Sequence, residues 1–228
     1  MNALFDLDGT LCDPREGIVL GFRHAYKAVG LPFPGETQVA AQIGRPLLDC
    51  FHALGCGQAG PEAARHFQDF FKTRGFAEAR LYEGVLECLD SLRRDGWRLG
   101  LASSKPAFVV CLVAEDLGLA PFMDGFHGCA PEDLNPDKRV IVRDALRALR
   151  WEASQTLLIG DREQDRDAAE ASGLAFVAAG WGFGSPAEHR GALSIAASPS
   201  ELGRVLARHV ESGAARRPGR PDPEETRR

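Results

Sequence analysis

The chain has 228 residues, which is long enough for one large domain or for a core with a smaller companion. Its formal net charge of -5 argues against a nucleic-acid polymer as partner, because phosphate backbones are bound by basic faces. The sequence lacks any apolar run near the roughly 18 residues of a membrane-spanning helix, and it opens without the basic and apolar regions of a secretory signal, so we expect a cytoplasmic protein without a membrane partner.

The N-terminal third of the chain begins with one strand and continues as helices. The apolar run ALFDL (residues 3–7) predicts a buried strand that ends at Gly9 and Thr10. No strand pattern appears between residues 14 and 80, so this stretch is expected to form a small helical module inserted after the first strand. Its helices are predicted at residues 15–30, 36–43, 46–54 and 61–76.

Strands and helices alternate in the rest of the chain. Strands are predicted at residues 98–104, 122–130, 156–161 and 175–182. Helices are predicted at residues 83–96, 106–118, 137–149, 163–173 and 198–210. This alternation predicts an α/β core, residues 1–13 and 81–211, with a parallel sheet covered on both faces.

Two further features bear on stability and location. The tail, residues 212–228, has no large apolar side chain and is rich in Pro, Arg and Glu, so it is predicted to be disordered. The six cysteines are scattered without C-x-x-C spacing, which favours reduced thiols over a zinc site or a disulfide framework.

Polar side chains gather where the predicted strands end. The carboxyl ends of parallel strands share one edge of a sheet, so side chains that follow different strands are expected to converge there. The candidates at that edge are Asp6, Asp8, Ser103, Ser104, Lys105, Lys138, Asp161 and Asp165.

This set of side chains points to phosphoryl transfer. Several carboxylates share a dry pocket only when a cation neutralises them, and Mg²⁺ prefers such oxygen ligands. One carboxylate can attack phosphorus, while a second protonates the leaving alcohol and later activates water. A serine hydroxyl and a lysine ammonium can bind the non-bridging phosphate oxygens.

The same residues resemble a known family. DLDGTL (6–11), LGLAS ending at Ser103, Lys138 and GDREQD (160–165) are similar, in order, to the four motifs of the haloacid dehalogenase-like (HAD) superfamily. The resemblance covers about residues 3–210. The segments IGRPL, LYEGV, SSKP and GWGFGS resemble a branch of phosphoglycolate phosphatases and 5′-nucleotidases.

The resemblance implies a Rossmann-like core with an α-helical cap, residues 14–80, and a role for each motif residue. Asp6 would be the nucleophile and Asp8 the general acid and base. Mg²⁺ would be held by Asp6, the Asp8 backbone carbonyl and Asp161, with Asp165 supporting the metal's water shell or orienting Lys138. Ser103 and Lys138 would hold the phosphate. Dehalogenases lack an acid at the Asp8 position, so the chain is more similar to the phosphoryl-transferring members.

Three further residues are candidate substrate contacts. Ser104 and Lys105 directly follow Ser103, and an ordinary neighbouring or solvated side chain is the alternative for each. Arg45, within IGRPL of the helical module, supplies a cationic fork that can hold a substrate anion. A solvent-facing arginine is the alternative there.

These observations lead to one leading hypothesis and two alternatives. The leading one is a Mg²⁺-dependent phosphatase, monomer or homodimer, that hydrolyses a small phosphomonoester through an aspartyl phosphate. A β-phosphoglucomutase-like phosphotransferase has the same first motif but returns the phosphoryl group to a sugar. A non-catalytic binding module of the same fold is the third, which the presence of all four motifs disfavours.

Overall fold

A computed structural model of the chain describes residues 1–214. Its last helix, α9 (Pro199–Ala214), runs past residue 212, where the sequence predicts the start of a disordered tail. The helix predicted at residues 198–210 therefore extends four residues beyond its expected end. The rest of that tail, residues 215–228, lies outside the described part of the chain.

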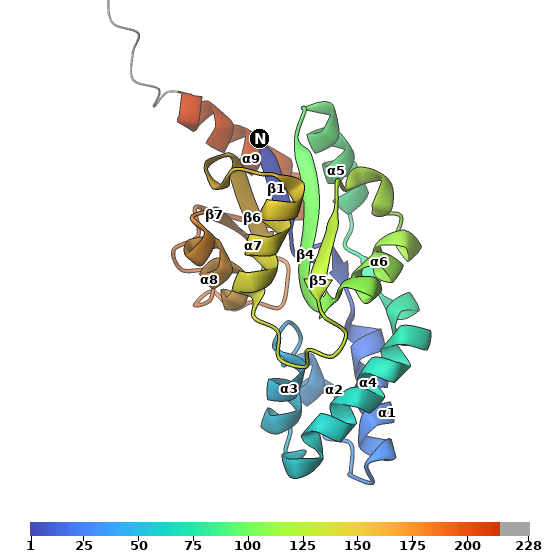
Figure 1. The fold of residues 1–228 in the computed structure, drawn as a ribbon. Coiled ribbons are helices and arrows are strands. Elements are labelled where there is room, and N and C mark those ends of the chain that lie inside the picture. Colours follow the sequence, from blue (N-terminus) through green and yellow to red (C-terminus); the bar gives the residue numbers. More distant parts are fainter. Residues whose placement is uncertain (215–228) are drawn as a thin grey trace, which may run out of the picture.

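A six-stranded, wholly parallel sheet forms the centre of the molecule (Figure 1). Its strand order is β5-β4-β1-β6-β7-β8. The strands are β1 (Asn2–Phe5), β4 (Arg98–Pro106), β5 (Phe126–Cys129), β6 (Thr156–Gly160), β7 (Ala175–Ala179) and β8 (Ser194–Ala196). The predicted parallel α/β core is confirmed. In the central register Phe5 lies between Leu101 and Ile159, so β1 and β6 end side by side, while β4 continues past them to Pro106.

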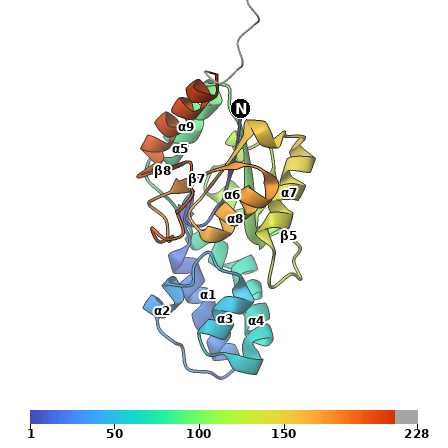
Figure 2. The same ribbon diagram turned by 90° about the vertical axis from the view of Figure 1, so that its left-hand side faces the viewer.

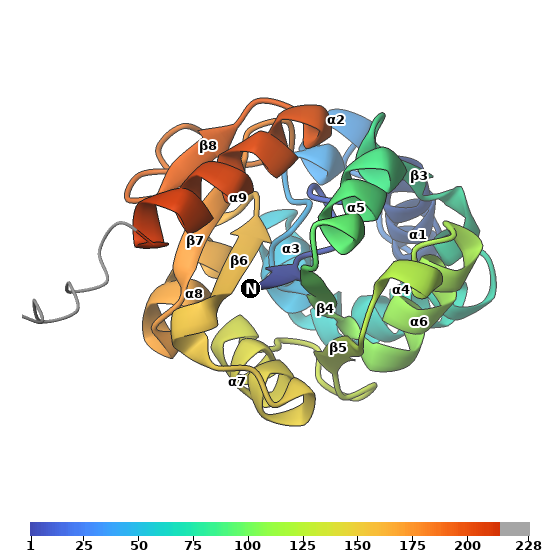
Figure 3. The ribbon, with the colours of Figure 1, turned by 90° about the horizontal axis from the view of Figure 1, so that it is seen from above.

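Helices cover both faces of this sheet (Figure 3). One face packs against α5 (Val85–Arg94), α6 (Ala107–Asp116) and α9, and the other against α7 (Lys138–Leu149) and α8 (Glu163–Ser172). Side chains alternate between the two faces, so Phe5 faces the first layer and Leu4 the second, both fully buried. Burying each such side chain stabilises the fold by roughly 1.5–3 kcal/mol.

Four helices form a separate layer beyond the carboxyl ends of the strands (Figures 1 and 2). These are α1 (Arg15–Ala28), α2 (Glu36–Ala40), α3 (Leu47–Ala53) and α4 (Gly60–Thr73), and we call residues 14–80 the helical module. Its interior is aromatic: the Phe22 ring stacks on Phe51 at 4.5 Å between centroids and meets Phe67 edge-on. The helical module lies next to the edge of the sheet where the candidate residues are expected.

Some elements differ from those predicted. The helix expected at 36–43 ends at Ala40, and the one expected at 61–76 ends at Thr73, where a short 3₁₀ segment (Gly75–Glu78) follows. Further 3₁₀ segments are Gly57–Ala59, Ala120–Phe122 and Ala153–Gln155.

A second, two-stranded sheet was not predicted. It pairs β2 (Cys12–Asp13) antiparallel with β3 (Arg80–Leu81), at the two points where the chain enters and leaves the helical module. Strands of two residues carry no alternation of polar and apolar side chains, so the sequence gives no signal for them. Across the described residues, no helix combines the length and apolarity needed to span a membrane.

Candidate active site

The first candidate residue continues the central sheet. The Asp6 backbone N–H donates to the Ile159 carbonyl at 2.8 Å, so the ladder between β1 and β6 extends one residue past β1. The chain then turns sharply at Gly9, which has φ +78°. A Cβ at that position would lie 2.3 Å from Asp161 Oδ2, so glycine alone lets the first loop approach the end of β6.

Three buried carboxylates meet at this edge of the sheet. One carboxylate oxygen from each of Asp6, Asp161 and Asp165 lies within 4.8 Å of the others. The Lys138 ammonium, at the start of α7, lies 2.5 Å from Asp6 Oδ1 and 2.5 Å from Asp165 Oδ1. The structure thus brings together four of the predicted site residues from three separate segments of the chain.

Asp161 is held on several sides by its neighbours. Its Oδ2 accepts the Phe183 backbone N–H at 2.7 Å, and its Oδ1 accepts the Thr10 hydroxyl at 3.4 Å. The His189 ring contacts the Asp161 carbonyl oxygen through Nε2 at 2.8 Å. The carboxylate is therefore fixed in position before any ligand binds, as a metal or phosphate site requires.

Burial and the repulsion from neighbouring carboxylates disfavour the charged forms of Asp6 and Asp161. Burial raises the pKa of Asp6 to about 7, and burial together with the charges of Asp165 and Asp6 raises the pKa of Asp161 to about 8. Burial opposes the charge of Lys138, but the Asp165 and Asp6 carboxylates outweigh it and raise its pKa above the ordinary value.

The charge balance of the cluster fits a divalent cation. Three carboxylates face a single ammonium, which leaves two negative charges in a buried space when all are ionised. Hard dications bind carboxylate oxygens and would neutralise this excess. The three carboxylates of Asp6, Asp161 and Asp165 could accordingly hold a divalent metal ion.

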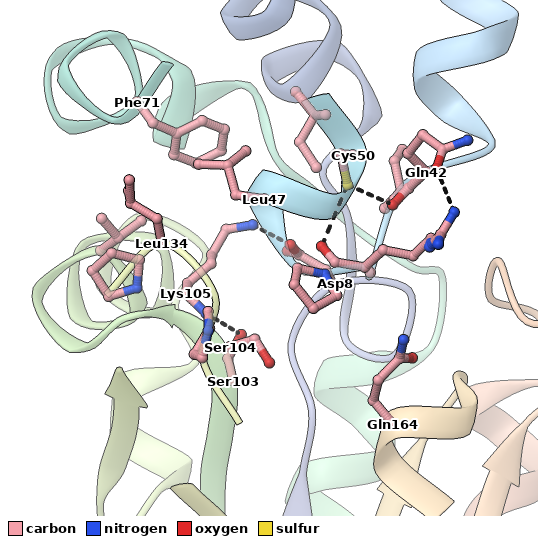
Figure 4. A pocket seen from close by; sticks show the side chains of 18 of the residues that line it. Asp8, Gln42, Leu47, Cys50, Phe71, Ser103, Ser104, Lys105, Leu134 and Gln164 are labelled. Carbon is pink, nitrogen blue, oxygen red and sulfur yellow. Dashed lines mark hydrogen bonds and ion pairs between the residues drawn. The ribbon is translucent and has the colours of Figure 1, made fainter. Parts of the chain in front are cut away.

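Asp8 lies next to this cluster and has a different partner. Its carboxylate forms an ion pair with the Lys105 ammonium, which comes from the end of β4 (Figure 4). The same ammonium lies over the Phe71 ring of α4, 4.9 Å from its centroid. Lys105 is predicted from the sequence as a substrate contact, and no sequence pattern indicates its pairing with Asp8.

The remaining predicted residues line one cavity between the core and the helical module. Ser103 is buried, and its hydroxyl accepts the Lys105 backbone N–H at 3.3 Å. Ser104 is half-buried on the same wall. Arg45 is exposed, and its guanidinium donates to the Gln42 side chain at 2.7 Å. All nine predicted site residues except Asp161 are among the cavity-lining residues.

Most of the cavity wall is apolar, which the sequence analysis missed. The apolar part from the helical module includes Ile18, Phe22, Val39, Ile43, Leu47, Phe67 and Phe71, and the core adds Phe108, Val109 and Leu134. The amide side chains of Gln42, Gln68 and Gln164 add neutral polar groups. Phe67 and Phe71 belong to the apolar stripe of α4, and sequence periodicity alone does not separate a core stripe from a cavity wall.

Comparison with known proteins agrees with this geometry. The family model of haloacid dehalogenase-like hydrolases matches residues 3–179. A 5′-nucleotidase of Pseudomonas aeruginosa is 35% identical over 83% of this chain and 86% of its own. The tyrosine-protein kinase PtkA of Mycobacterium tuberculosis is 33% identical over 79% of this chain, which spans 62% of that protein.

A solved structure shows the same fold. A predicted phosphatase from Clostridium acetobutylicum superposes with a TM-score of 0.85 at 29% identity, over 91% of this chain and 98% of that one. The family model covers most of the chain and includes the segments that contain Asp6, Ser103, Lys138 and Asp161. The chain therefore belongs to the haloacid dehalogenase-like hydrolase family and is related to its phosphatases.

Proposed function

We propose that the protein is a Mg²⁺-dependent phosphatase that hydrolyses a small phosphomonoester through a phosphoryl group carried on Asp6. The observation that carries the proposal is the buried cluster of Asp6, Asp161 and Asp165 around Lys138, with the Asp8 carboxylate beside it. Bound at Asp6, Asp161 and the Asp8 carbonyl, Mg²⁺ would neutralise carboxylate and phosphate charge so that an anionic nucleophile can approach.

The first half of the reaction forms one bond and breaks one. An Asp6 carboxylate oxygen attacks phosphorus, and the bond between phosphorus and the ester oxygen breaks. Asp8 enters this step protonated, without its ion pair to Lys105, and gives its proton to the departing alkoxide, which leaves as an alcohol. The Lys138 ammonium and the Ser103 hydroxyl bind non-bridging phosphate oxygens and stabilise the charge that develops on them.

The second half returns the enzyme to its starting state. Asp8, now ionised, accepts a proton from a water molecule as that water attacks phosphorus. The bond between phosphorus and the Asp6 oxygen breaks, inorganic phosphate leaves, and both carboxyl groups are restored. Asp8 thus serves as acid and then as base, and its ion pair with Lys105 keeps its carboxylate beside the reaction centre.

The helical module fits the role of a cap. It stands over the reacting edge of the sheet, and residues of both parts line the cavity. A cap in this place excludes bulk water and selects the leaving group. We accordingly propose residues 14–80 as cap, 1–13 and 81–211 as core.

The residues of the cavity wall favour a substrate whose leaving group has an uncharged ring over one whose leaving group carries a second anionic group. Flat rings pack on aromatic side chains, and neutral amides bind the polar edge of a base. Lys138, Lys105 and Arg162 already pair with carboxylates, which leaves Arg45, at the exposed rim, as the remaining cation among the cavity-lining residues. A nucleoside monophosphate, the substrate class in the name of the Pseudomonas relative, fits this wall, and phosphoglycolate is the alternative.

Replacing Asp8 by Asn tests the assignment of acid and base. With p-nitrophenyl phosphate the leaving group needs little protonation, so Asp6 phosphorylation should survive far better than with an alkyl phosphate. Breakdown of the phosphoenzyme should slow, because no base activates water. Rapid-quench measurement of both steps checks this. Equal loss of phosphorylation with both substrates, and no phosphoenzyme, would contradict the assignment.

Arg45→Ala tests which substrate class the rim selects. If Arg45 binds a second anionic group, kcat/KM for phosphoglycolate should fall about 10- to 150-fold, the loss expected for one hydrogen bond to a charged group. Activity on p-nitrophenyl phosphate and on uridine 5′-monophosphate (UMP) should change little, since neither has a second anionic group. A panel of phosphomonoesters assayed with Mg²⁺ measures this. Equal loss on all three would mean that Arg45 organises the cap instead.

A phosphotransferase is the second candidate, because one relative is named as a protein kinase. Both reactions share phosphorylation of Asp6 and differ in the acceptor. Release of inorganic phosphate from a monoester without any added bisphosphate supports the phosphatase. Transfer to an alcohol acceptor in preference to water would support the alternative.

A further inference from the structure

Arg162 joins the core to the helical module. It follows Asp161 and stands immediately before α8, yet its guanidinium turns away from solvent, with only 11% of the side chain exposed. One nitrogen, Nη1, donates to the Ile43 carbonyl of the helical module at 2.6 Å. Another, Nε, pairs with Glu188 Oε1 of the core at 2.8 Å. The guanidinium therefore fastens the loop between α2 and α3 to the core.

The loop is shaped to receive this side chain. Gly44 has φ +89°, a conformation that side-chain-bearing residues rarely adopt. A Cβ at position 44 would also lie 2.9 Å from Arg162 Cγ and 3.4 Å from its Cδ. Position 44 therefore favours glycine for two reasons: its backbone conformation, and the lack of space for a Cβ. The close approach of Arg162 accounts for the lack of space.

Glu188 is fixed in turn, so it can hold Arg162. Its Oε2 accepts the Ser185 backbone N–H at 2.8 Å, and its own carbonyl accepts from Arg166 at 3.1 Å. The Arg162 backbone N–H donates to Asp165 Oδ2 at 3.0 Å. One residue thus contacts the carboxylate cluster through its backbone and the α2–α3 loop through its side chain.

The fastened loop is part of the cavity wall. Gln42, Ile43, Gly44 and Arg45 all line it. Figure 4 shows Gln42 on the side of the cavity away from Phe71 and Leu134. A hydrogen bond from the Leu48 N–H to the Leu134 carbonyl, 3.3 Å, joins module and core on that other side. Residues 42–45 thus share one cavity with Asp6, so a shift of this loop would change the space beside the candidate nucleophile.

We propose that Arg162 is a positioning residue: anchored by Glu188, it seats the loop of residues 42–45 over the cavity and so sets the fit of the substrate's leaving group. The kinetic part of this inference rests on the proposed phosphatase function. The structural part, the seating of the loop, does not. A contact that only adds stability would lower the stability of the whole fold without freeing this loop in particular.

Hydrogen exchange of the full-length protein tests the seating directly. In Arg162→Ala, amide exchange in residues 42–45 should quicken about 10- to 150-fold, because one hydrogen bond to a charged group is lost, while α1 exchanges as in the wild type. Gly44→Ala should free the same loop. Gly55→Ala is the matched control: its φ is +80° but nothing lies within 4 Å, so the loop should exchange as in the wild type. Unchanged exchange in Arg162→Ala would overturn the proposal.

A kinetic comparison tests the consequence for substrate fit. With UMP, whose leaving group reaches the loop, Arg162→Ala should raise KM about 10-fold or more with a smaller change in kcat. With acetyl phosphate, whose leaving group is too small to reach it, kcat/KM should stay within about threefold of the wild type. Arg162→Lys, which keeps one donor and the charge, should recover part of the fit.

The two proposals fail in different ways. Equal loss on UMP and acetyl phosphate would overturn the positioning role, since Arg162 would then act on the phosphate end of the site. No hydrolysis of any phosphomonoester or of acetyl phosphate by the wild type with Mg²⁺ would overturn the phosphatase function. The exchange measurement would still decide whether Arg162 seats the loop.

Discussion

Asp6→Asn is expected to lower kcat by about 10⁴-fold or more, the scale of loss when an essential nucleophile is removed. The substitution keeps the shape of the side chain but removes the oxygen anion that attacks phosphorus. It also removes one carboxylate from a cluster in which burial already raises the pKa of Asp6 to about 7, so the fold should not lose stability through charge repulsion. Steady-state turnover of p-nitrophenyl phosphate with Mg²⁺ measures the effect.

A matched variant separates chemistry from folding. Asp49→Asn makes the same change on an exposed residue of α3 that does not line the cavity, and it should turn over as the wild type does. Thermal unfolding of both variants checks that each is folded. An Asp6→Asn protein that keeps more than a tenth of wild-type turnover would contradict the role of Asp6 as nucleophile.

Removing the metal is expected to lower turnover as much as Asp6→Asn does. Excess EDTA should abolish turnover, added Mg²⁺ should restore it, and Ca²⁺ should restore it poorly because it favours a looser, higher coordination.

Removal of the metal should also change the stability of the fold, by an amount that depends on pH. The pKa values of Asp6 and Asp161 are raised to about 7 and about 8, so the folded metal-free protein holds protons that the unfolded chain has released.

The sign of the effect follows from these protons. A carboxyl group whose pKa is raised by folding stabilises the metal-free fold fully at pH values below the pKa of the unfolded chain, near 3.8. This contribution is lost as the pH rises toward the folded pKa values of about 7 for Asp6 and about 8 for Asp161. Mg²⁺ competes with the protons and offsets the repulsion, so its stabilising effect should grow between pH 6 and pH 8. Melting temperatures with EDTA or Mg²⁺ at both pH values measure it. Full turnover in excess chelator, or a larger Mg²⁺ effect at pH 6, would contradict the role of the ion.

The sheet and the positions of the motif residues follow from the sequence for a simple reason. Asp6, Ser103 and Asp161 each come after an apolar run, and parallel strands end at a common edge, so their convergence follows from topology alone. Lys138 was predicted near a helix start, and the structure places its ammonium between Asp6 and Asp165. The sequence therefore predicts the edge of the sheet at which these residues gather. The distances between their side chains are known only from the folded structure.

The contacts between core and module were beyond sequence reasoning. The Arg162 bond to the Ile43 carbonyl and the apolar wall at Phe71 depend on how the helical module sits on the sheet, and the Lys105 pair with Asp8 depends on how two segments of the core meet. None of them has a characteristic spacing along the chain, because the partners are far apart in sequence. The two-residue strands β2 and β3, which fix the entry and exit of that module, are too short to show any pattern.

Trapping the phosphoryl group on the chain tests the central claim most directly. Enzyme mixed with p-nitrophenyl phosphate and Mg²⁺, quenched in acid and treated with borohydride, should have one aspartyl residue reduced to homoserine. Peptide mass spectrometry should place that residue at Asp6, with none in Asp6→Asn and more in Asp8→Asn, whose phosphoenzyme breaks down slowly. Turnover of the same substrate with no reduced aspartate at Asp6 in either the wild type or Asp8→Asn would contradict the account.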